Sequence, residues 1–420
     1  MAVVLVTGGF IGLTLASFIT LVNYHNKATA RSQTWNNCMA VVEAGIEEAL
    51  THSAYNYRTN MVSSGWTVTN SSYGKTAAVL SGAAQGGGGV AYPNGYYTVT
   101  ISTNLPYTIL ATGYYPIPAT SKYLARTVRV TTTNQGVFSG AMFVRSYIDM
   151  NGNNVKTDSY DSTNPNKSTL GKYDPLKAGD HGDVSTTTGL TNSVNVGNAN
   201  VWGHVYTGPS GGVKYGANGA VGDVAWQTAG NSGIEAGWWR NDFNVTVPDV
   251  TPPFTNAPAP LGGSVLGVGY DYILGNGNYQ LSSFGKNALV TGNAVLYVTG
   301  DIKFTGSDSI TINPGGSLTI YAAGANAQFN VINSSNPSAT SFMYYGLPSN
   351  TSLVLKGQNF LLGCVYAPEA DFVMTGGGDV YGSLVANSAR FTGNSAFHYD
   401  ESLINVGLSR GFLITSWNEQ

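Results

Sequence analysis

The first 22 residues, Met1 to Val22, contain no charged side chain. A run of about 20 predominantly apolar residues is long enough to cross the hydrocarbon core of a bilayer as a helix. No proline follows this run as far as His52, so the sequence predicts one continuous helix over residues 1–52. At a rise of 1.5 Å per residue, such a helix is about 80 Å long.

The second half of the predicted helix carries an apolar stripe. Its members recur at steps of three and four residues: Trp35, Cys38, Met39, Val42, Ile46, Ala49 and Leu50. This spacing places them on one face of a helix, and Glu43, Glu47 and Glu48 lie off or beside that face. We therefore expect this half to pack against a folded domain, and the uncharged half to lie in lipid or among other helices.

Three glycines, Gly8, Gly9 and Gly12, lie inside the uncharged half. In a helix interior each costs roughly 1 kcal/mol relative to alanine. Small residues let helices approach closely, so the glycines favour a helix–helix contact over a plain membrane anchor. A cleaved secretory signal is disfavoured, because no basic residue precedes Lys27 and the apolar run is too long.

The rest of the chain is nearly uncharged and rich in glycine. Charged residues make up 10% of the 420, against about 25% in ordinary soluble domains, and there are 54 glycines and 26 tyrosines. With 42% hydrophobic and 11% aromatic residues the chain can bury a core, and the composition is typical of extracellular β proteins. A net charge of −3 without a basic cluster argues against nucleic acid as a partner.

No cofactor or metal site is predicted. The two cysteines, Cys38 and Cys364, have neither CxxC nor Cys/His spacing. We interpret them as buried free thiols, since a disulfide would require the β region to fold back on the helix. His181 lies between Asp180 and Asp183, but we interpret these three as solvated loop residues rather than metal ligands.

Residues 53–135 predict a small sheet that covers the second half of the helix. Three alternating or β-branched runs are the expected strands: Tyr96–Ser102, Tyr107–Thr112 and Leu124–Thr131. The glycine run Gln85–Gly89 lacks the flanking strand, helix and lysine of a phosphate-binding loop. It is predicted to be a plain loop.

Residues 136–410 alternate very short apolar runs with Gly, Asn and Asp, as in Val295–Val298 and Ser317–Tyr321. Strands of three to five residues at irregular spacing favour a parallel β-helix over a sandwich. The proline-rich Val247–Pro260 cannot lie in a central strand and is predicted to be an extended arm. Residues 411–420 are predicted to be a C-terminal tail. The fold class expected is α+β, mostly β, with a long hydrophobic helix, a small sheet module and a C-terminal parallel β-helix.

Both ends of the chain resemble a known family. The start MAVVLVTGGFIGLTLASFITLV and the later VVEAGIEEAL are similar to the N-terminal helix of type IV pilin-like proteins, of the minor-pilin class involved in pilus assembly. Other segments resemble a β-helical domain that follows such helices: Asp158–Ser162, Asn200–Pro209, Val365–Asp371, Gly376–Ala386, His398–Leu403 and Ser416–Glu419. The resemblance implies a structural domain without a defined activity.

The resemblance also implies how the helix is used. In such proteins a short basic leader is removed after a glycine and the mature chain begins with Phe or Met, which fits an N-methylated Met1 here. Major pilins carry glutamate at the fifth mature position, where it aligns a new subunit with its neighbour's terminal amine. This chain has Leu5 instead. The positions implied to assemble are Met1, Leu5, Gly8, Gly9, Phe10, Gly12, Leu15, Phe18 and Leu21.

Parallel β-helices also include polysaccharide-degrading enzymes, which need two carboxylates facing one cleft, roughly 5–9.5 Å apart in hydrolases. Acidic residues are densest at Asp158–Asp161 and Asp400–Glu401. Capping of turns explains such positions as well. Lys and Arg are sparse in the β region, so no catalytic residue is predicted and the chain is not expected to be an enzyme.

Trp226, Trp238 and Trp239 are candidate surface aromatics in a loop-rich stretch. They are suited to stacking on a sugar ring or a neighbouring subunit, or to filling the core beneath a loop.

The features together predict a structural subunit of an extracellular, type IV pilus-like filament. It is expected to be a homo-oligomer held by N-terminal helices, inserted in the inner membrane before assembly and located at the cell surface afterwards. The alternative is a minor pilin-like or membrane-anchored adhesin that binds surface glycans. An anchored, β-helical polysaccharide-degrading enzyme is a third possibility.

Overall fold

The computed structural model describes residues 2–55, 61–69, 71–79, 94–102, 107–118, 120–152, 154–245, 247–356, 361–407 and 409–420. The chain divides into two compact units. Unit 1 comprises Met1–Gln135 and Gly411–Gln420, and unit 2 comprises Gly136–Arg410. The fold is mostly β with one long N-terminal helix, and unit 2 is built largely of parallel strands.

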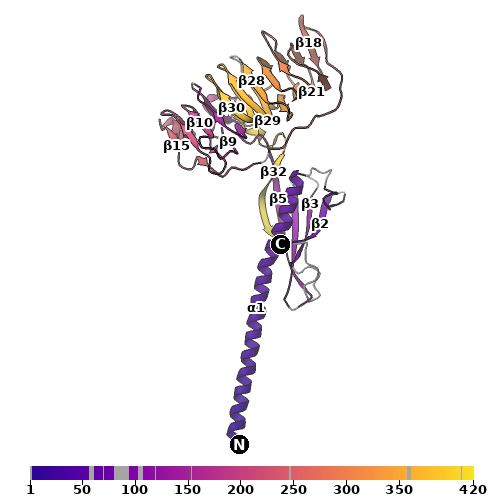
Figure 1. Cartoon of the computed structure of the whole chain (residues 1–420), viewed down its shortest axis with the longest axis vertical. Helices are drawn as coiled ribbons and strands as arrows, with labels where there is room; N and C mark the ends of the chain where they lie inside the picture. The colour runs from indigo at the N-terminus through magenta and orange to yellow at the C-terminus, as the bar shows by residue number, and fades with distance from the viewer. Residues whose placement is uncertain are drawn as a thin grey trace. The chain divides into compact units, whose positions relative to one another are not determined.

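In unit 1 the helix α1 (Ala2–Tyr55) is continuous, which confirms the helix predicted over residues 1–52 (Figure 1). Six strands form one sheet in the order β1-β2-β3-β4-β5-β32. Their bounds are β1 Thr67–Val68, β2 Ser72–Ala78, β3 Tyr96–Ser102, β4 Thr108–Pro116, β5 Tyr123–Gly136 and β32 Ser409–Glu419. The three strands predicted in this region are confirmed, and most of the expected tail lies in β32. The run Gln85–Gly89 lies outside the described residues.

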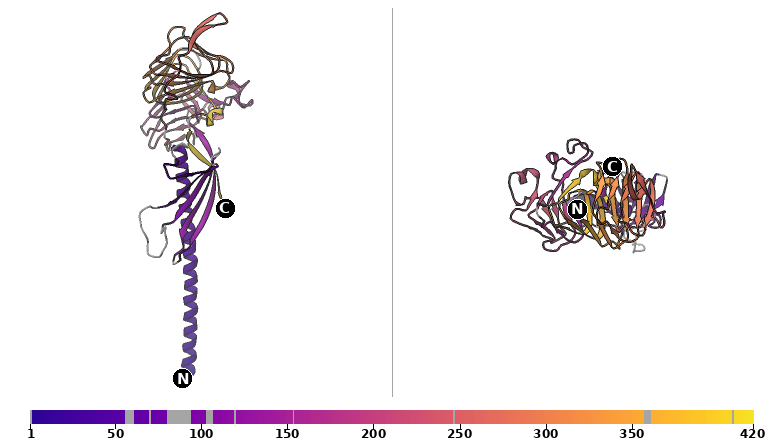
Figure 2. Two further views of the ribbon diagram at one scale, coloured as in Figure 1. Left: turned by 90° about the vertical axis from the view of Figure 1, so that its right-hand side faces the viewer. Right: turned by 90° about the horizontal axis from the view of Figure 1, so that it is seen from above.

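The sheet covers only the second half of α1 (Figure 2). Side chains at alternate positions of β3 and β4 are buried, because successive residues of a strand point to opposite faces. They form one core with the helix: Val99, Ile101, Ile109 and Ala111 from the sheet, and Val41, Val42, Ile46 and Ala49 from α1. The predicted stripe is thus mostly buried. Trp35 is the exception, at 45% exposed, with the Arg126 guanidinium 4.6 Å from its ring centre.

The first part of unit 2 contains short strands in a regular pairing. Their bounds are β6 Met142–Val144, β7 Ile148–Asp149, β8 Lys156–Tyr160, β9 Val184–Thr186, β10 Val194–Gly197, β11 Asn200–Trp202, β12 Val205–Tyr206, β13 Val213–Tyr215, β14 Ala220–Gly222, β15 Gly233–Ile234 and β16 Trp239–Arg240. From β6 to β11, each strand pairs in parallel with the third strand after it, as in β6–β9 and β7–β10. Two short helices interrupt them, η1 (Pro175–Lys177) and α2 (Val224–Thr228).

The second part begins with an antiparallel pair, β17 and β18, and then repeats the parallel pattern. Its bounds are β17 Leu261–Val265, β18 Val268–Leu274, β19 Gly277–Leu281, β20 Ala288–Val290, β21 Asn293–Val298, β22 Ile302–Lys303, β23 Ile310–Ile312, β24 Ser317–Ala322, β25 Asn326–Phe329, β26 Ile332–Ser334, β27 Phe342–Gly346, β28 Ser352–Lys356, β29 Leu361–Thr375, β30 Val380–Phe391 and β31 Ala396–Asp400. Strands β20 to β25 each pair with the third strand after them. The short helices η2 (Ala339–Ser341) and η3 (Glu401–Asn405) complete this part.

The two parts of unit 2 meet where the chain enters and leaves it. Strand β30 pairs with β6 and β7, and β31 pairs with β8, so the first and last strands are neighbours. Figure 1 shows β15, β10, β9, β30, β29, β28, β21 and β18 following one another across the unit. The described residues of the segment 241–260, which lies between β16 and β17, contain no helix or strand, which agrees with the predicted arm.

The core of unit 2 is formed by aligned apolar side chains. In the register of β21, β24 and β27, Leu296, Ile320 and Tyr344 stand in one row and are all buried. Phe284, Phe304, Phe329 and Phe342 form a second row, with ring centres 5.0, 5.7 and 6.1 Å apart. Cys364 is also buried here. Both cysteines are free, which confirms the interpretation as buried thiols, and burial raises the pKa of the Cys364 thiol.

Candidate functional site

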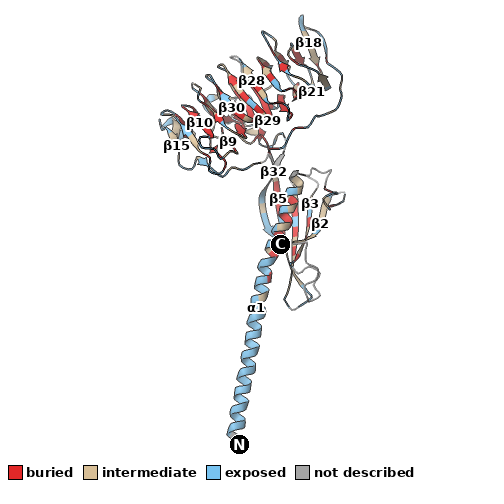
Figure 3. Ribbon diagram, in the orientation of Figure 1, coloured by how far each residue is buried: buried red, intermediate tan, exposed pale blue. Residues whose placement is uncertain are grey.

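The first half of α1 exposes an apolar surface on every side of the helix, blue in Figure 3. Large side chains from Val3 to Val22 keep between 38% and 76% of their surface exposed, including consecutive positions. By length and composition α1 can cross a membrane, with mean hydropathy 2.0 in its most apolar window and none of that window buried. Met1 lies outside the described residues. The other predicted assembly positions are all on this surface: Leu5, Gly8, Gly9, Phe10, Gly12, Leu15, Phe18 and Leu21.

Hydroxyl groups in this half are satisfied within the helix. Thr7 and Ser17 each donate to the carbonyl four residues earlier at 2.8 Å, and Thr14 and Thr20 do the same at 3.0 and 2.8 Å. A hydroxyl bonded in this way needs no water, so it can enter an apolar environment at little cost. These four polar side chains therefore do not interrupt the apolar surface.

The glycines of this half have no role inside the subunit. A Cβ atom added at Gly8, Gly9 or Gly12 would meet nothing within 4 Å, and the backbone there is helical. Their helix-destabilising effect is therefore not offset by any contact within the chain. Small residues at these positions leave room for another helix to approach closely.

Glycines in the packed half behave differently. A Cβ at Gly113 of β4 would lie 2.6 Å from the carbonyl oxygen of Cys38 and 2.8 Å from the amide nitrogen of Val42. A Cβ at Gly45 would lie 2.9 Å from the Tyr97 ring. These glycines let the sheet approach the helix backbone directly. Sequence reasoning did not identify them, because an isolated glycine in a strand gives no indication of what approaches it.

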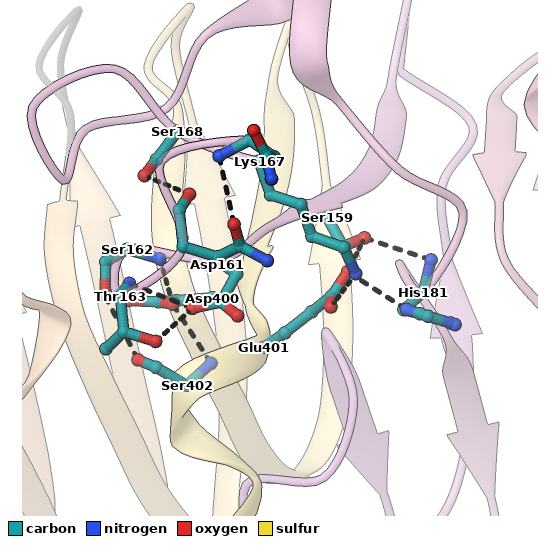
Figure 4. Close-up of polar contacts among 12 residues, drawn as sticks. Ser159, Asp161, Ser162, Thr163, Lys167, Ser168, His181, Asp400, Glu401 and Ser402 are labelled. Carbon is teal, nitrogen blue, oxygen red and sulfur yellow. Dashed lines mark hydrogen bonds and ion pairs between the residues drawn. The ribbon is translucent and has the colours of Figure 1, made fainter.

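In unit 2, the densest acidic clusters of the sequence come together around Glu401 (Figure 4). The Glu401 carboxylate accepts hydrogen bonds from the Ser159 hydroxyl at 2.8 Å, His181 Nδ1 at 2.9 Å and the Lys167 ammonium. Burial opposes ionisation of Glu401, but these partners outweigh it and lower its pKa to about 2. The same contact raises the pKa of His181. The cluster thus fastens the loop between β8 and β9 to the end of the last strand.

Other acids of this region cap turns, which is the explanation that the sequence offered besides catalysis. Asp161 accepts from the Thr163 amide at 2.9 Å, and Asp174 from the Leu176 amide at 3.0 Å. Asp400 caps η3 by accepting from the Ser402 amide at 3.2 Å. Among the described residues, no group of three or more His, Cys, Asp and Glu side chains is arranged to hold a metal ion.

A second buried network joins β8 to β31. Asp158 and His398 are hydrogen-bonded to each other. Asp158 also accepts from the Tyr173 hydroxyl at 2.6 Å and pairs with Lys156 at 2.8 Å. Burial raises the pKa of Asp158, but His398 and Lys156 together outweigh burial and hold it below its usual range. The partner of His398 lies 240 positions earlier, beyond the reach of local pattern reasoning.

The three candidate tryptophans do not form one cluster. Trp238 is half-buried and stacks on His204 with ring centres 4.2 Å apart, and Trp239, 40% exposed, donates to the Thr207 hydroxyl at 3.2 Å. Trp226 lies in α2, where its amide is capped by Asp223. Among the described residues, no ring contact joins any two of the three tryptophans.

Known proteins share limited similarity with this chain. Residues 258–406 match a family model described as a domain of unknown function, DUF7305. No curated protein matches the sequence. Among solved structures, the chain is similar to the competence-associated pilin ComZ from Thermus thermophilus, at 12% identity over 91% of this chain and 97% of that chain, with a TM-score of 0.29. It is also similar to the DUF3494 domain of an ice-binding protein from Shewanella frigidimarina, at 16% identity over 64% and 99% of the two chains, with a TM-score of 0.23. TM-scores this low carry no argument about fold or function.

Proposed function

We propose that the chain is the structural subunit of an extracellular, type IV pilus-like filament that polymerises through the first half of α1. The observation that carries the proposal is the contrast along one helix. From Thr34 onward α1 buries residues against its own sheet, whereas from Val3 to Val22 it buries none. A surface that is apolar on all sides must be covered by something outside the subunit.

Two environments can bury this apolar surface: the lipid of a membrane and a bundle of identical helices. Before assembly the apolar half lies in the inner membrane, and in the filament it lies among the same halves of neighbouring subunits. Where water is the alternative, burial is worth about 25 cal/mol per Å². Because lipid is equally apolar, the step from membrane to filament depends on close packing, which Gly8, Gly9 and Gly12 allow. Because residue 5 is leucine, this contact lacks the glutamate that major pilins carry at the fifth position.

Unit 2 is the displayed head, and we propose that it is a parallel β-helix. The pairing of each strand with the third strand after it supports a coil of three strands per turn. The aligned rows of buried side chains along the strands support the same arrangement. The head is assigned no enzymatic role.

The test separates anchoring from assembly. In Gly8→Ile and Gly12→Ile the helix stays apolar and gains no clash within the subunit, so membrane insertion is retained. The added side chains hold neighbouring helices apart, so filaments in the sheared surface fraction, counted by electron microscopy, fall at least tenfold. Leu5→Arg should reduce both insertion and filaments. Asn26→Asp, a charge placed in the polar stretch after Val22, is the matched control and should leave filaments unchanged.

Normal filaments in both isoleucine variants would exclude packing through the glycines. The alternative function, a membrane-anchored adhesin that binds glycans without polymerising, makes a different prediction. The wild-type protein would then be monomeric in detergent and absent from the sheared fraction. N-terminal mass spectrometry provides independent support if the mature chain begins at an N-methylated Met1.

A further inference from the structure

A cavity of about 240 Å³ opens in unit 2 where its first and last strands meet. Its aromatic wall consists of Tyr160 from β8, Tyr381 from β30 and Tyr173 from the loop between β8 and β9. Lys172 and Pro337 are exposed parts of its lining. The cavity depends on the pairing of β8 with β31, because that pairing brings residues more than 200 positions apart into one wall.

The three tyrosine rings are held at steep angles to one another. Tyr160 meets Tyr173 and Tyr381 edge to face, with ring centres 5.7 and 6.5 Å apart, and Tyr173 is 5.7 Å from Tyr381. Both of the latter rings also contact His398: the Tyr173 ring is tilted against it at 3.8 Å, and the Tyr381 ring stacks on it at 4.7 Å. The hydroxyl of Tyr173 is fixed by Asp158. The wall is therefore preorganised, and a ligand would not have to order it.

Two polar groups at this cavity are uncommitted. Within the described part of the chain, neither the Tyr160 hydroxyl nor the Lys172 ammonium has a hydrogen-bond or ion-pair partner. Tyr160 as a whole residue is only 1% exposed. Ligand hydroxyls can satisfy both groups, one accepting from Lys172 and one exchanging a hydrogen bond with Tyr160.

The charge around the wall selects against an anion. Besides the paired Asp158, the carboxylates of Asp379 and Asp400 lie close enough to raise the pKa values of the wall tyrosines. The pKa of Tyr381 rises to about 12, mainly through burial and then through Asp379. One oxygen of Asp400 is buried and has no hydrogen-bond partner among the described residues. Lys172 is the sole cationic member of the lining and lies at its exposed edge. A neutral ligand fits this balance better than a carboxylate or phosphate.

We propose that this cavity binds one neutral hexopyranose residue of a glycan. The apolar C–H face of the sugar packs on the partly exposed rings of Tyr173 and Tyr381, and its hydroxyls bond to Tyr160 and Lys172. The volume is below the roughly 300–1,000 Å³ of pockets for drug-sized ligands, which suits a single ring rather than a longer oligosaccharide. The site is independent of the tryptophans and of filament assembly.

Saturation-transfer NMR on the full chain tests the proposal, in a micelle of zwitterionic detergent without a sugar headgroup. The probes are the methyl glycosides of glucose, galactose and mannose, with sodium glucuronate as the charged counterpart. At least one neutral glycoside should bind. Tyr160→Phe keeps the ring and removes one hydrogen bond, so it should weaken binding about three- to tenfold, and Lys172→Ala should do the same.

Matched controls lie on β13, away from the cavity. Tyr215→Phe and Lys214→Ala change the same residue types at exposed positions and should leave binding unchanged. Near-UV circular dichroism of each variant establishes that the fold is retained. The proposal is overturned if no neutral glycoside binds, if glucuronate binds as tightly as the neutral sugars, or if the cavity variants bind like the β13 controls.

Discussion

Individual glycines determine how closely the sheet of unit 1 approaches α1. At Gly113 the neighbouring atoms are backbone atoms of Cys38 and Val42, which cannot rotate away as a side chain can. At Gly74, in β2 of the same sheet, an added Cβ would meet only side-chain atoms, the Thr67 hydroxyl at 3.3 Å and the Thr100 methyl at 3.9 Å. Two strand glycines that look alike in the sequence thus differ in their surroundings: a side chain at Gly113 would clash with backbone, and one at Gly74 would not.

Gly113→Ala should therefore destabilise unit 1 by about 1–3 kcal/mol, the usual cost of forcing extra volume into a packed core. The reason is a backbone contact that only movement of the sheet can relieve. Gly74→Ala is the control and should change stability by less than about 0.5 kcal/mol. Chemical denaturation of the full chain in detergent, followed by far-UV circular dichroism, measures both. Equal stability of the two variants would show that α1 and β4 are not so close.

The His181–Glu401 pair makes the loop between β8 and β9 sensitive to pH. The hydrogen bond to Glu401 raises the pKa of His181, so its contribution to stability is complete below about pH 6.5 and is lost as pH rises through the raised value. The pKa of Glu401 is lowered to about 2, so its contribution is present above about pH 4.3 and is lost as pH falls toward 2. The pair contributes most between these limits.

We expect the wild-type head to melt at a lower temperature at pH 8 than at pH 5.5. In His181→Gln this difference should shrink, because the titrating group is absent. His204→Gln is the control: His204 pairs with Asp183 at 3.4 Å but does not contact Glu401 in the structure. If the pH dependence is unchanged in His181→Gln, another group is responsible.

At the scale of elements, the arm Val247–Pro260 lies along a row of tyrosines. Tyr297, Tyr321, Tyr345 and Tyr366 occupy matching positions of β21, β24, β27 and β29. Near one end the Tyr366 hydroxyl donates to the Pro248 carbonyl at 2.5 Å, and near the other the Phe254 ring lies 6.0 Å from Tyr297. Val247 and Val250 are buried three residues apart, the repeat of a polyproline II helix.

Phe254→Ala should loosen the arm without unfolding the strands beneath it. Phe254 is half-buried, so the loss should be about 1–2 kcal/mol, below the roughly 3–5 kcal/mol of a fully buried phenylalanine. The arm should then be cut faster by proteinase K, with cleavage sites between residues 247 and 260 identified by mass spectrometry. Asn256→Ala, at an exposed position of the same arm, should be cut at the wild-type rate.

Helices and strands with a local sequence pattern could be predicted from the sequence, but the strands and side chains that they pair with could not. The uncharged run and the Val42–Ile46–Ala49 spacing predict α1, and alternation predicts β3 and β5. The pairing of β31 with β8, or of His398 with Asp158, joins residues 240 apart, and no local periodicity encodes it. The same limit applies to the tyrosine cavity. Its three tyrosines come from β8, the loop after β8 and β30, which lie far apart in the sequence.

At the scale of the whole molecule, the segment that forms unit 2 is inserted in the sequence between two strands of unit 1. The chain leaves along β5 and returns along β32, its neighbour in that sheet. The two strands run in opposite directions, since Arg126 pairs with Glu419 at 2.7 Å whereas Thr415 donates to the carbonyl of Thr131, nearer the end of β5. An insertion at the turn of an antiparallel pair leaves the sheet complete without it.

The insertion predicts that the two functions can be separated. Replacing residues 138–407 by Asn-Gly closes β5 and β32 with a two-residue hairpin turn. The shortened chain should keep α1 and the six-stranded sheet, with the Arg126–Glu419 pair intact, and should insert in the membrane. If the first half of α1 alone drives assembly, it should also form thinner filaments, visible by electron microscopy. Residues 137–407 expressed alone should be a folded, water-soluble head, because they lack the exposed apolar helix, and they should bind the same neutral glycoside as the full chain. A folded, membrane-inserted short chain without filaments would instead assign the subunit contacts to unit 2.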